Sequence, residues 1–337
     1  MPQASTIYIA SNCDNDFVLF YATLLKSIEL HHHTSEKIVS YLIGDNITTL
    51  NKKKVENSLD TGSIEIRWLS SKKFIPDGMH LPDDRSLFPI SIYMNLYLAD
   101  SLPHSIKKLL YLDVDLIFQT DISELYNLDL EGNIIGAALD RYKDFGHPWG
   151  GIKNYKDLGF TAKMPYLNTG VMLIDTEKWR ANNITTKTID AINQHKKYSH
   201  LADQYGLNVV FGNLPWLVLP QKWNHVSFEK PVEKPSIIHY IAEKPTFRAY
   251  KGLKEFQNIF YDYLNQTQFK GAKKVTRFYT RLKKLRIIFS KVYKKFSNDF
   301  NALIGQNFCY FQISFFFCQI SREFTAFHPN IYISSFF

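Results

Sequence analysis

Cysteine is scarce in this sequence. Cys13, Cys309 and Cys318 are the only three among 337 residues, and no two of them form a Cys-x-x-Cys pair. Three scattered cysteines cannot build a disulfide framework, and without a paired motif they do not suggest a zinc site. Because disulfide-rich chains belong to oxidising compartments, we expect a protein of the reducing cytoplasm.

Long hydrophobic runs are also absent. A membrane-spanning helix needs roughly 18 to 20 apolar residues in succession. The densest apolar stretch, residues 308–320, is shorter than that and contains Gln312, Ser314 and Gln319. The beginning of the chain, MPQASTIYIASN, has no basic region and no long apolar core. We therefore expect neither a membrane span nor a secretory signal.

The glycine patterns of the common phosphate-binding loops are missing as well. No G-x-G-x-x-G follows the first apolar run, and no G-x-x-x-x-G-K-[ST] occurs in the sequence. Dinucleotide-binding and P-loop sites need those glycines to bring the backbone close to phosphate, so both classes are excluded. Spacing alone supports no Ser-His-Asp catalytic set either.

Acidic residues are missing from one segment, between Asp262 and Asp299, which holds eleven lysines and arginines. The formal net charge of the chain is +8, so subtracting these eleven charges leaves −3 on the remainder. A positive net charge favours nucleic-acid binding when the basic residues lie on the folded domain. Here the remainder of the chain, which would form that domain, is mildly acidic. We therefore expect no nucleic-acid partner and keep a nucleic-acid-binding protein as the non-enzymatic alternative.

Up to about residue 265 the sequence alternates short β-branched runs with helical patterns. This alternation predicts an α/β fold in which helices cover both faces of a mainly parallel sheet. The predicted strands are residues 7–11, 38–43, 64–68, 108–112, 134–138, 171–174 and 216–219. The predicted helices are residues 17–31, 91–101, 185–195 and 203–211.

The chain changes character after residue 265. Within residues 266–296, apolar residues recur at three- and four-residue steps among basic side chains, which predicts a basic amphipathic helix. Such a helix binds anionic membrane surfaces, so we expect peripheral association with the inner face of the cytoplasmic membrane. The alternative is that its apolar stripe packs on the protein body or on a partner helix. Residues 297–337 hold 10 of the 26 phenylalanines without a clear period, and we predict no structure for this tail.

Two carboxylates follow the apolar run of residues 109–112: Asp113 and Asp115, with Val114 between them. In an open α/β sheet, ligands bind outside the carboxyl ends of the strands. Two carboxylates at that place repel each other unless a cation lies between them. Carboxylate oxygens suit Mg²⁺ or Mn²⁺, which can also hold a diphosphate. The alternative is that Asp-x-Asp only ends a strand and begins a turn.

Four further blocks accompany this motif, at residues 11–17, 167–180, 203–204 and 239–245. Together with residues 111–115, they resemble in their order glycosyltransferase family 8. This family comprises retaining galactosyl- and glucosyltransferases, including bacterial lipopolysaccharide-core enzymes and glycogenin. The resemblance covers most of residues 5–260. It implies a catalytic domain of the GT-A type, with a Rossmann-like and mainly parallel sheet, over residues 1–265.

The resemblance also implies a metal site and a nucleotide-sugar donor. Asp113, Asp115 and His239 would bind Mn²⁺, with Mg²⁺ as the alternative, since Mn²⁺ accepts oxygen and nitrogen ligands together. The donor would be a UDP-hexose, and Lys244 would neutralise its departing diphosphate as a point charge. Gln204 would lie nearest the anomeric carbon and stabilise an oxocarbenium ion.

The remaining blocks would hold the nucleotide and the sugar. Asp14 would accept from the base or ribose, and Phe17 would stack on the base where the family often has tyrosine. Asp16 stands where asparagine is common. Asp203 and Asp140, with Gln204, form the expected catalytic set. The expected donor-binding residues are Asp14, Asp16, Phe17, Asn95, Asp113, Val114, Asn168, Thr169, Gly170 and Lys244.

Asn95 departs from the family pattern. Arginine is usual at this place and would reach the donor phosphate and sugar, so asparagine removes a charge-assisted fork. The asparagine leaves three alternatives: another cation takes over the role of the arginine, the donor differs from that of the family, or the activity is impaired.

The resemblance implies transfer of galactose or glucose from a UDP-sugar to a sugar acceptor, with retention at the anomeric carbon. The expected acceptor is a carbohydrate or lipid-linked saccharide, such as a growing lipopolysaccharide or lipooligosaccharide core. The alternatives are a nucleotidyltransferase of related fold and a family member that folds but does not catalyse.

Overall fold

The computed structural model describes residues 6–71, 74–75 and 90–274. All of them lie in one compact unit that spans Met1–Thr280. The predicted tail, 297–337, and most of the predicted amphipathic helix, from residue 275 to residue 296, lie outside the described residues.

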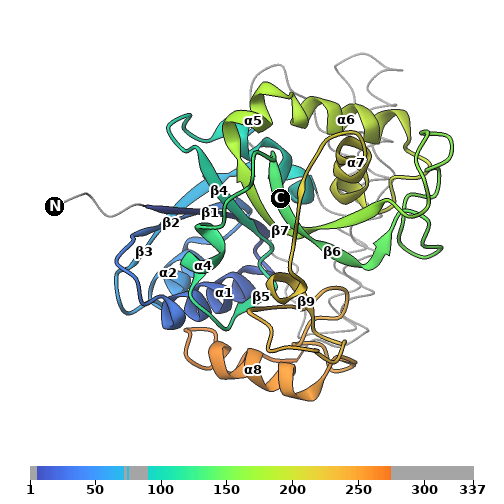
Figure 1. Ribbon diagram of the computed structural model, residues 1–337. Helices are drawn as coiled ribbons and strands as arrows, with labels where there is room; N and C mark the ends of the chain where they lie inside the picture. The colour runs from blue at the N-terminus through green and yellow to red at the C-terminus, as the bar shows by residue number, and fades with distance from the viewer. Residues whose placement is uncertain (1–5, 72–73, 76–89, 275–337) are drawn as a thin grey trace, which may run out of the picture. The chain divides into compact units, whose positions relative to one another are not determined.

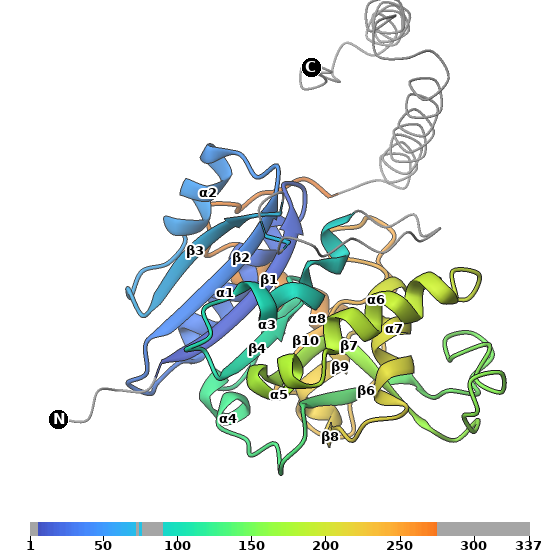
Figure 2. The same cartoon turned by 90° about the horizontal axis from the view of Figure 1, so that it is seen from above.

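A seven-stranded sheet forms the centre of this unit, in the order β3-β2-β1-β4-β7-β6-β8 (Figure 1, Figure 2). β7 pairs antiparallel with both of its neighbours, whereas the other strands run parallel to one another. This arrangement confirms the predicted mainly parallel α/β sheet. The strands are β1 (Ile7–Asp14), β2 (Ile38–Asp45), β3 (Ile64–Ser70), β4 (Lys108–Leu112), β6 (Ile135–Asp144), β7 (Pro165–Asp175) and β8 (Leu217–Leu219).

A smaller sheet of three strands follows the same chain. Its order is β5 (Leu116–Phe118), β10 (Ile237–His239) and β9 (His225–Val226), with β10 antiparallel to β5 and parallel to β9. Only three residues, Asp113 to Asp115, separate β4 of the large sheet from β5 of the small one. The carboxylate pair therefore occupies the passage between the two sheets.

Helices cover both faces of the large sheet, and two hydrophobic clusters fill the layers between them (Figure 1). One cluster joins the sheet to η2, α3, α5, α6 and α7. The other joins it to α1, α4 and α8. The helices are α1 (Val18–His31), α2 (Thr49–Glu56), η2 (Ile90–Tyr97), α3 (Leu98–Ser101), α4 (Ile122–Tyr126), α5 (Thr176–Ala181), α6 (Ile184–Gln194), α7 (Ala202–Phe211), η3 (Gln221–Asn224) and α8 (Lys254–Leu264).

The predicted α-helix over residues 91–101 is wrong in type. The segment winds as a 3₁₀ helix, η2, and becomes α-helical only in the short α3. Every side chain from Tyr93 to Leu98 is buried, so packing on several sides shapes this segment rather than an amphipathic stripe. Tertiary packing has overridden the local pattern here.

The chain stays packed on the body beyond residue 265, where we placed the domain boundary. Gln268 N donates to Ser58 Oγ over 2.9 Å, and Phe269 packs against the cluster under α1 and α8. No helix in the described part of the chain has the length and apolarity that crossing a bilayer requires.

Candidate functional site

Backbone hydrogen bonds hold both ends of the carboxylate motif. Asp113 N donates to Gly170 O on β7 over 2.8 Å. Asp115 O accepts from Tyr240 N, just after β10, over 3.0 Å. The motif is therefore held between a strand of the large sheet and a strand of the small one, which brings His239 at the end of β10 to the two aspartates.

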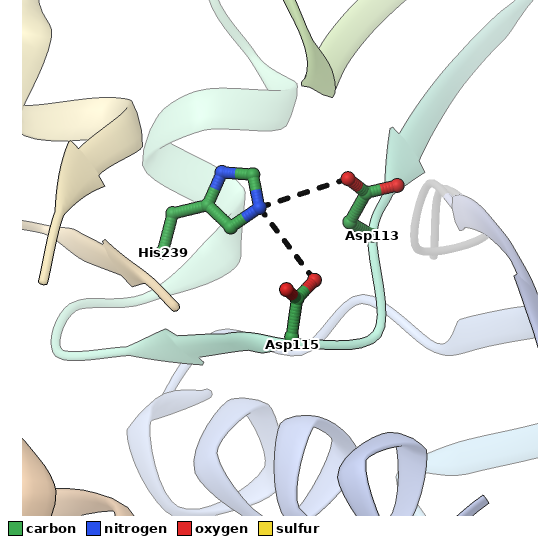
Figure 3. A group of neighbouring side chains, drawn as sticks. All are labelled: Asp113, Asp115 and His239. Atoms are coloured by element: carbon green, nitrogen blue, oxygen red, sulfur yellow. Dashed lines mark ion pairs between the residues drawn. The ribbon is translucent and has the colours of Figure 1, made fainter. Parts of the chain in front are cut away.

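Asp113, Asp115 and His239 form a compact cluster (Figure 3). His239 Nε2 lies 3.6 Å from Asp113 Oδ2 and 3.5 Å from Asp115 Oδ1. One ligand atom from each of the three residues falls within 4.8 Å of the others. Asp115 and His239 are buried, while the Asp113 side chain is 37% exposed and leaves the cluster open on one side.

The charges around the cluster move the two carboxyl pKa values in opposite directions. Burial raises the pKa of Asp113, and the neighbouring charge of Asp115 raises it further. Burial also acts to raise the pKa of Asp115, but the Lys244 ammonium and His239 outweigh it and hold that pKa below its usual value. The pair is thus uneven: Lys244 neutralises Asp115, whereas no lysine or arginine among the described residues forms an ion pair with Asp113.

A relay of amide groups determines which nitrogen of His239 faces the carboxylates. Gly170 N donates to Asn168 Oδ1 over 2.9 Å, which fixes the orientation of the Asn168 amide. Asn224 Nδ2 donates to the same oxygen over 2.8 Å, so Asn224 Oδ1 points to His239 Nδ1, also at 2.8 Å. His239 Nδ1 must therefore carry the proton in that hydrogen bond, and in the neutral ring the lone pair of Nε2 faces the two aspartates.

This donor set fits a divalent cation. A nitrogen lone pair and two carboxylates directed at one another repel without a positive charge between them, and they match the ligand preferences of Mn²⁺. The second ring nitrogen of a metal-bound histidine is usually held by an oxygen acceptor, as Asn224 holds it here. The three residues could therefore bind a divalent metal.

Gly170 makes room for this cluster. A Cβ atom at this position would lie 2.4 Å from His239 Cε1 and 2.9 Å from Asp113 Oδ2. Only glycine lets β7 pass so close to the two ligands. The glycine of the predicted block thus has a steric reason to be there.

A second polar cluster lies beside the first, where β6, β7 and α7 meet. Asn168 Nδ2 donates to Asp140 Oδ2 over 2.8 Å, and Gln204 Nε2 donates to the same oxygen over 3.2 Å. Gln204 Oε1 lies 3.4 Å from both Asn168 Nδ2 and Thr169 N. The structure therefore brings four predicted site residues, Asp140, Asn168, Thr169 and Gln204, into one network, and Asn168 joins it to the histidine relay.

Asp203 contacts the residue that replaces the expected arginine. Asn95 Nδ2 donates to Asp203 Oδ2 over 2.6 Å, and both side chains are buried. Burial raises the pKa of Asp203 to about 7, and the charge of Asp113 acts in the same direction, while the hydrogen bond from Asn95 opposes them. Asn95 Oδ1 has no hydrogen-bond partner within the described ranges.

The predicted nucleotide-binding turn follows β1. Asp14 Oδ1 accepts from Asp16 N over 2.9 Å and from Phe17 N over 3.0 Å, which shapes the turn into α1. The Phe17 ring is half-buried and stacks on Phe20 with 5.4 Å between ring centroids. Base stacking on Phe17 and base or ribose contacts of Asp14 and Asp16 stay predictions.

Tyr111 connects this turn to the carboxylate motif. Its hydroxyl oxygen lies 2.7 Å from Asn12 Oδ1 and 2.8 Å from Asp113 Oδ1, so its single hydrogen can donate to either. The hydroxyl therefore links the ends of β1 and β4, which are neighbours in the sheet.

The other predicted residues lie around the aspartates. The Lys244 ammonium pairs with Asp115 and donates to Tyr240 O over 3.0 Å. The Val114 side chain is buried in the cluster under α1, so only its backbone is placed to meet a ligand.

Sequence reasoning missed Asn224 and Tyr111 as members of the site. Asn224 ends the short η3 helix, where nothing in the local pattern marks an asparagine as a partner of His239. Tyr111 belongs to the quoted metal block, but we predicted no role for its side chain. Only the fold brings these two side chains to the ligands.

Known proteins resemble this chain in sequence over much of its length. A general stress protein of Bacillus subtilis is 26% identical over 73% of this chain and 89% of its own length. A putative glycosyltransferase of Haemophilus influenzae is 26% identical over 61% of this chain and 59% of its own length.

The solved structures that resemble this chain share its GT-A-type fold. The galactosyltransferase LgtC, in complex with donor and acceptor sugar analogues, matches with a TM-score of 0.63 and 22% identity, over 77% of this chain and 96% of LgtC. The bifunctional glycosyltransferase WbbM matches with a TM-score of 0.64 and 18% identity, over 80% of this chain and 51% of WbbM. The sequence model of glycosyl transferase family 8 matches residues 8–246, and this chain belongs to that family.

Proposed function

We propose that this chain is a retaining, metal-dependent hexosyltransferase that moves galactose or glucose from a UDP-sugar to a sugar acceptor. The observation that carries the proposal is the cluster of Asp113, Asp115 and His239, in which Nε2 faces two carboxylates. The neighbouring network of Asp140, Asn168 and Gln204 supplies the polar groups that a sugar ring requires. Membership of family 8 supports the same reaction class.

The metal-binding end of the site serves the leaving group. Mn²⁺ or Mg²⁺ held by Asp113, Asp115 and His239 would supply Lewis acidity to the diphosphate of the donor. The ammonium of Lys244, now paired with Asp115, adds a positive charge at the same place. Charge that develops on a departing diphosphate is stabilised best by groups already in position.

The other end of the site serves the sugar. Asp140 and Asn168 present an acceptor and a donor that can hold hydroxyl groups, and their mutual hydrogen bond keeps them in place. Gln204 directs its amide oxygen toward Asn168 and Thr169 over 3.4 Å, long contacts that leave this oxygen able to stabilise positive charge on an anomeric carbon. Asp203 lies one residue away and contacts Asn95.

Release of UDP tests this function. We expect the purified protein to release UDP from UDP-galactose or UDP-glucose in the presence of Mn²⁺. Excess EDTA should abolish this release. Asp113→Asn and Asp115→Asn should each lower the rate by about 100-fold or more, as loss of a preorganised electrostatic group does. Asp190→Asn, at an exposed position on α6, is the matched control.

Three results would count against the proposal. Wild-type rates in Asp113→Asn or Asp115→Asn, or full activity in excess EDTA, would contradict the metal-dependent mechanism. Release of pyrophosphate in place of UDP would indicate the nucleotidyltransferase alternative. A wild-type protein that hydrolyses no nucleotide-sugar, while Asn95→Arg does, would indicate an impaired family member.

The acceptor in this proposal is a lipid-linked saccharide, such as a lipopolysaccharide core, at the inner face of the cytoplasmic membrane. The basic composition of residues 266–296 supports this placement. A helix of that kind would keep the enzyme beside an acceptor that cannot leave the bilayer.

A further inference from the structure

A hollow lined by aromatic side chains lies next to the sugar end of the site. None of the residues that line it has been assigned to the donor. The hollow is an open depression, and the atom-free space of about 410 Å³ in and above it includes open solvent. Its lining consists of Trp149, Gly150, Gly151, Lys153, Tyr166, Tyr198, His200, Leu201 and Tyr205.

Two tyrosines connect the hollow to the candidate catalytic groups. Tyr166 lies two residues before Asn168 on β7, and its hydroxyl shares a hydrogen bond with Gln204. Tyr205 follows Gln204 directly on α7, and its hydroxyl donates to Asn154 Oδ1 over 3.0 Å. A molecule in the hollow would therefore lie beside the groups that hold the donor sugar.

Trp149 is an exposed member of the lining, with 83% of its surface accessible. It belongs to the loop after β6, which lies beside α7 (Figure 1, Figure 2). Single exposed apolar residues are common on protein surfaces. Trp149, however, is grouped with three tyrosines around one concavity, which is the usual form of a small-molecule site.

The loop that carries Trp149 is held firmly. Gly146 N donates to Ala162 O over 2.8 Å, and Ile152 N donates to Phe145 O over 2.9 Å. A Cβ atom at Gly150 would lie 1.8 Å from the ring of Tyr142, and one at Gly151 would lie 2.1 Å from Phe145 O. The two glycines let the backbone pack inward while the indole stays in solvent. The ring is thus presented at a defined place before anything binds.

The chemistry of the lining favours a saccharide. A sugar ring has faces of C–H groups, which pack on aromatic rings, and an edge of hydroxyls, which need hydrogen-bonding groups. Trp149 and Tyr198 offer rings, whereas Lys153 and His200 offer polar groups. The lining contains no Asp or Glu, so a cation is a poor match, and the predicted nucleotide turn lies at the end of β1 instead.

We propose that this hollow binds the acceptor saccharide, with Trp149 as the ring on which an acceptor sugar stacks. The inference rests on the proposed function, because an acceptor is required only if the chain transfers a sugar. It assigns acceptor binding to the loop after β6 and the start of α7, on the Gln204 side of the site.

The experiment separates the Michaelis constants of acceptor and donor. The full chain with Mn²⁺ is given the UDP-sugar that it hydrolyses, and lactose, maltose and cellobiose serve as acceptor probes. Trp149→Ala should raise the acceptor KM about tenfold or more, which corresponds to about 1.4 kcal/mol, while the donor KM changes less than about twofold. Trp149→Phe keeps an aromatic ring and should recover most of the affinity. Leu50→Ala, at another exposed apolar residue, is the control for surface changes.

Direct binding keeps the proposal testable apart from catalysis. Saturation-transfer NMR without donor should detect at least one of the three probes on the wild-type chain and lose the signal in Trp149→Ala. An unchanged acceptor KM, an equal rise of both Michaelis constants, or no binding of any probe overturns the proposal. A wild-type chain that binds a probe but releases no UDP would contradict the proposed function and leave the saccharide site supported.

Discussion

At the scale of single residues, the orientation of one imidazole ring depends on a buried asparagine. Asn224 is 2% exposed and lies between Asn168 and His239, donating to the first and accepting from the second. A histidine whose Nδ1 is held in this way presents Nε2 to a metal without first having to reorient or change tautomer.

Asn224→Leu should weaken Mn²⁺ binding about 10- to 100-fold, since loss of such a supporting partner costs that much affinity. Asn224→Asp keeps an acceptor for Nδ1–H but loses the donor to Asn168 Oδ1, so it should weaken Mn²⁺ binding less than Asn224→Leu does. Titration of Mn²⁺ followed by electron paramagnetic resonance measures the affinity, and ¹⁵N NMR of the His239 ring reports the tautomer. Wild-type affinity in Asn224→Leu, with the folded state intact, would show that the relay has no part in binding.

Asp203 makes the stability of the fold dependent on pH. Its pKa of about 7 in the folded protein lies above the value of about 3.9 expected in an unfolded chain. Between these values the folded state binds more protons than the unfolded state, so the free energy of unfolding falls as pH rises from about 4 to about 7. Each pKa unit is worth about 1.4 kcal/mol.

Asp203→Asn should remove this dependence while keeping an acceptor for Asn95. In EDTA, the unfolding free energy of the variant minus that of the wild type should increase from pH 5 to pH 8 by on the order of 1–3 kcal/mol. Urea denaturation at several pH values measures it. A difference that stays constant over this range would mean that Asp203 is ionised throughout.

At the scale of elements, one side chain sets the position of α7 against β7. Asn208 Oδ1 accepts from Leu167 N over 2.8 Å, and Asn208 Nδ2 donates to Leu167 O over 2.9 Å. These bonds satisfy the backbone N–H and C=O of Leu167, directly before Asn168. They hold the helix that carries Asp203 and Gln204 against the strand that carries Asn168.

Asn208→Leu leaves two buried backbone groups of Leu167 without partners, each costing roughly 1–3 kcal/mol. We expect a loss of about 3 kcal/mol in unfolding free energy, measured by urea denaturation, with a lower rate of UDP release. Asn213→Ala, at an exposed position after the same helix, should change stability by less than about 0.5 kcal/mol. Equal stability of the two variants would show that Asn208 does not hold α7 in place.

The patterns of the sequence predict these elements unequally well. The core strands β1, β2 and β4 begin at the predicted residues because their runs are mainly apolar, with single polar residues such as Ser40 and Lys108. β7 begins six residues earlier than its apolar run, since Tyr166 to Gly170 are buried by tertiary packing despite their polar members. For the same reason the buried η2 segment does not follow the predicted α-helical geometry.

At the scale of the whole molecule, the basic region after the folded body has a proposed role at the membrane. Phe269 and Ala272 pack against the body, so a clean removal of this region begins after Lys274. A chain ending at Lys274 should keep its UDP release but no longer sediment with anionic vesicles, because each cation near such a surface contributes about 1 kcal/mol.

Vesicles of neutral lipid are the control for this experiment. Unchanged sedimentation of the truncated chain with anionic vesicles would refute the membrane role. Binding of the full chain to nucleic acid with a steep salt dependence, and not to vesicles, would favour the nucleic-acid alternative instead.

Much of the candidate site can be predicted from the sequence because its residues occur in short blocks. Asp113 and Asp115 are close in space because they are close in the chain, and both follow a buried strand. His239 joins them from more than a hundred residues away, and only its resemblance to a family block predicted this. Asn224 belongs to no block, so nothing in the sequence could predict its contact with His239.

By itself the sequence determined the α/β class, the strand that ends in two carboxylates, and the separation of a mildly acidic body from a basic region. These features depend on composition and on the local alternation of apolar and polar residues, which each segment carries independently. Only the tertiary structure decided the proton position on His239, the contact of Asn95 with Asp203, and the hollow beside Gln204. Those features depend on contacts between side chains from distant segments of the chain. Such contacts form only when β7, β10 and α7 pack together.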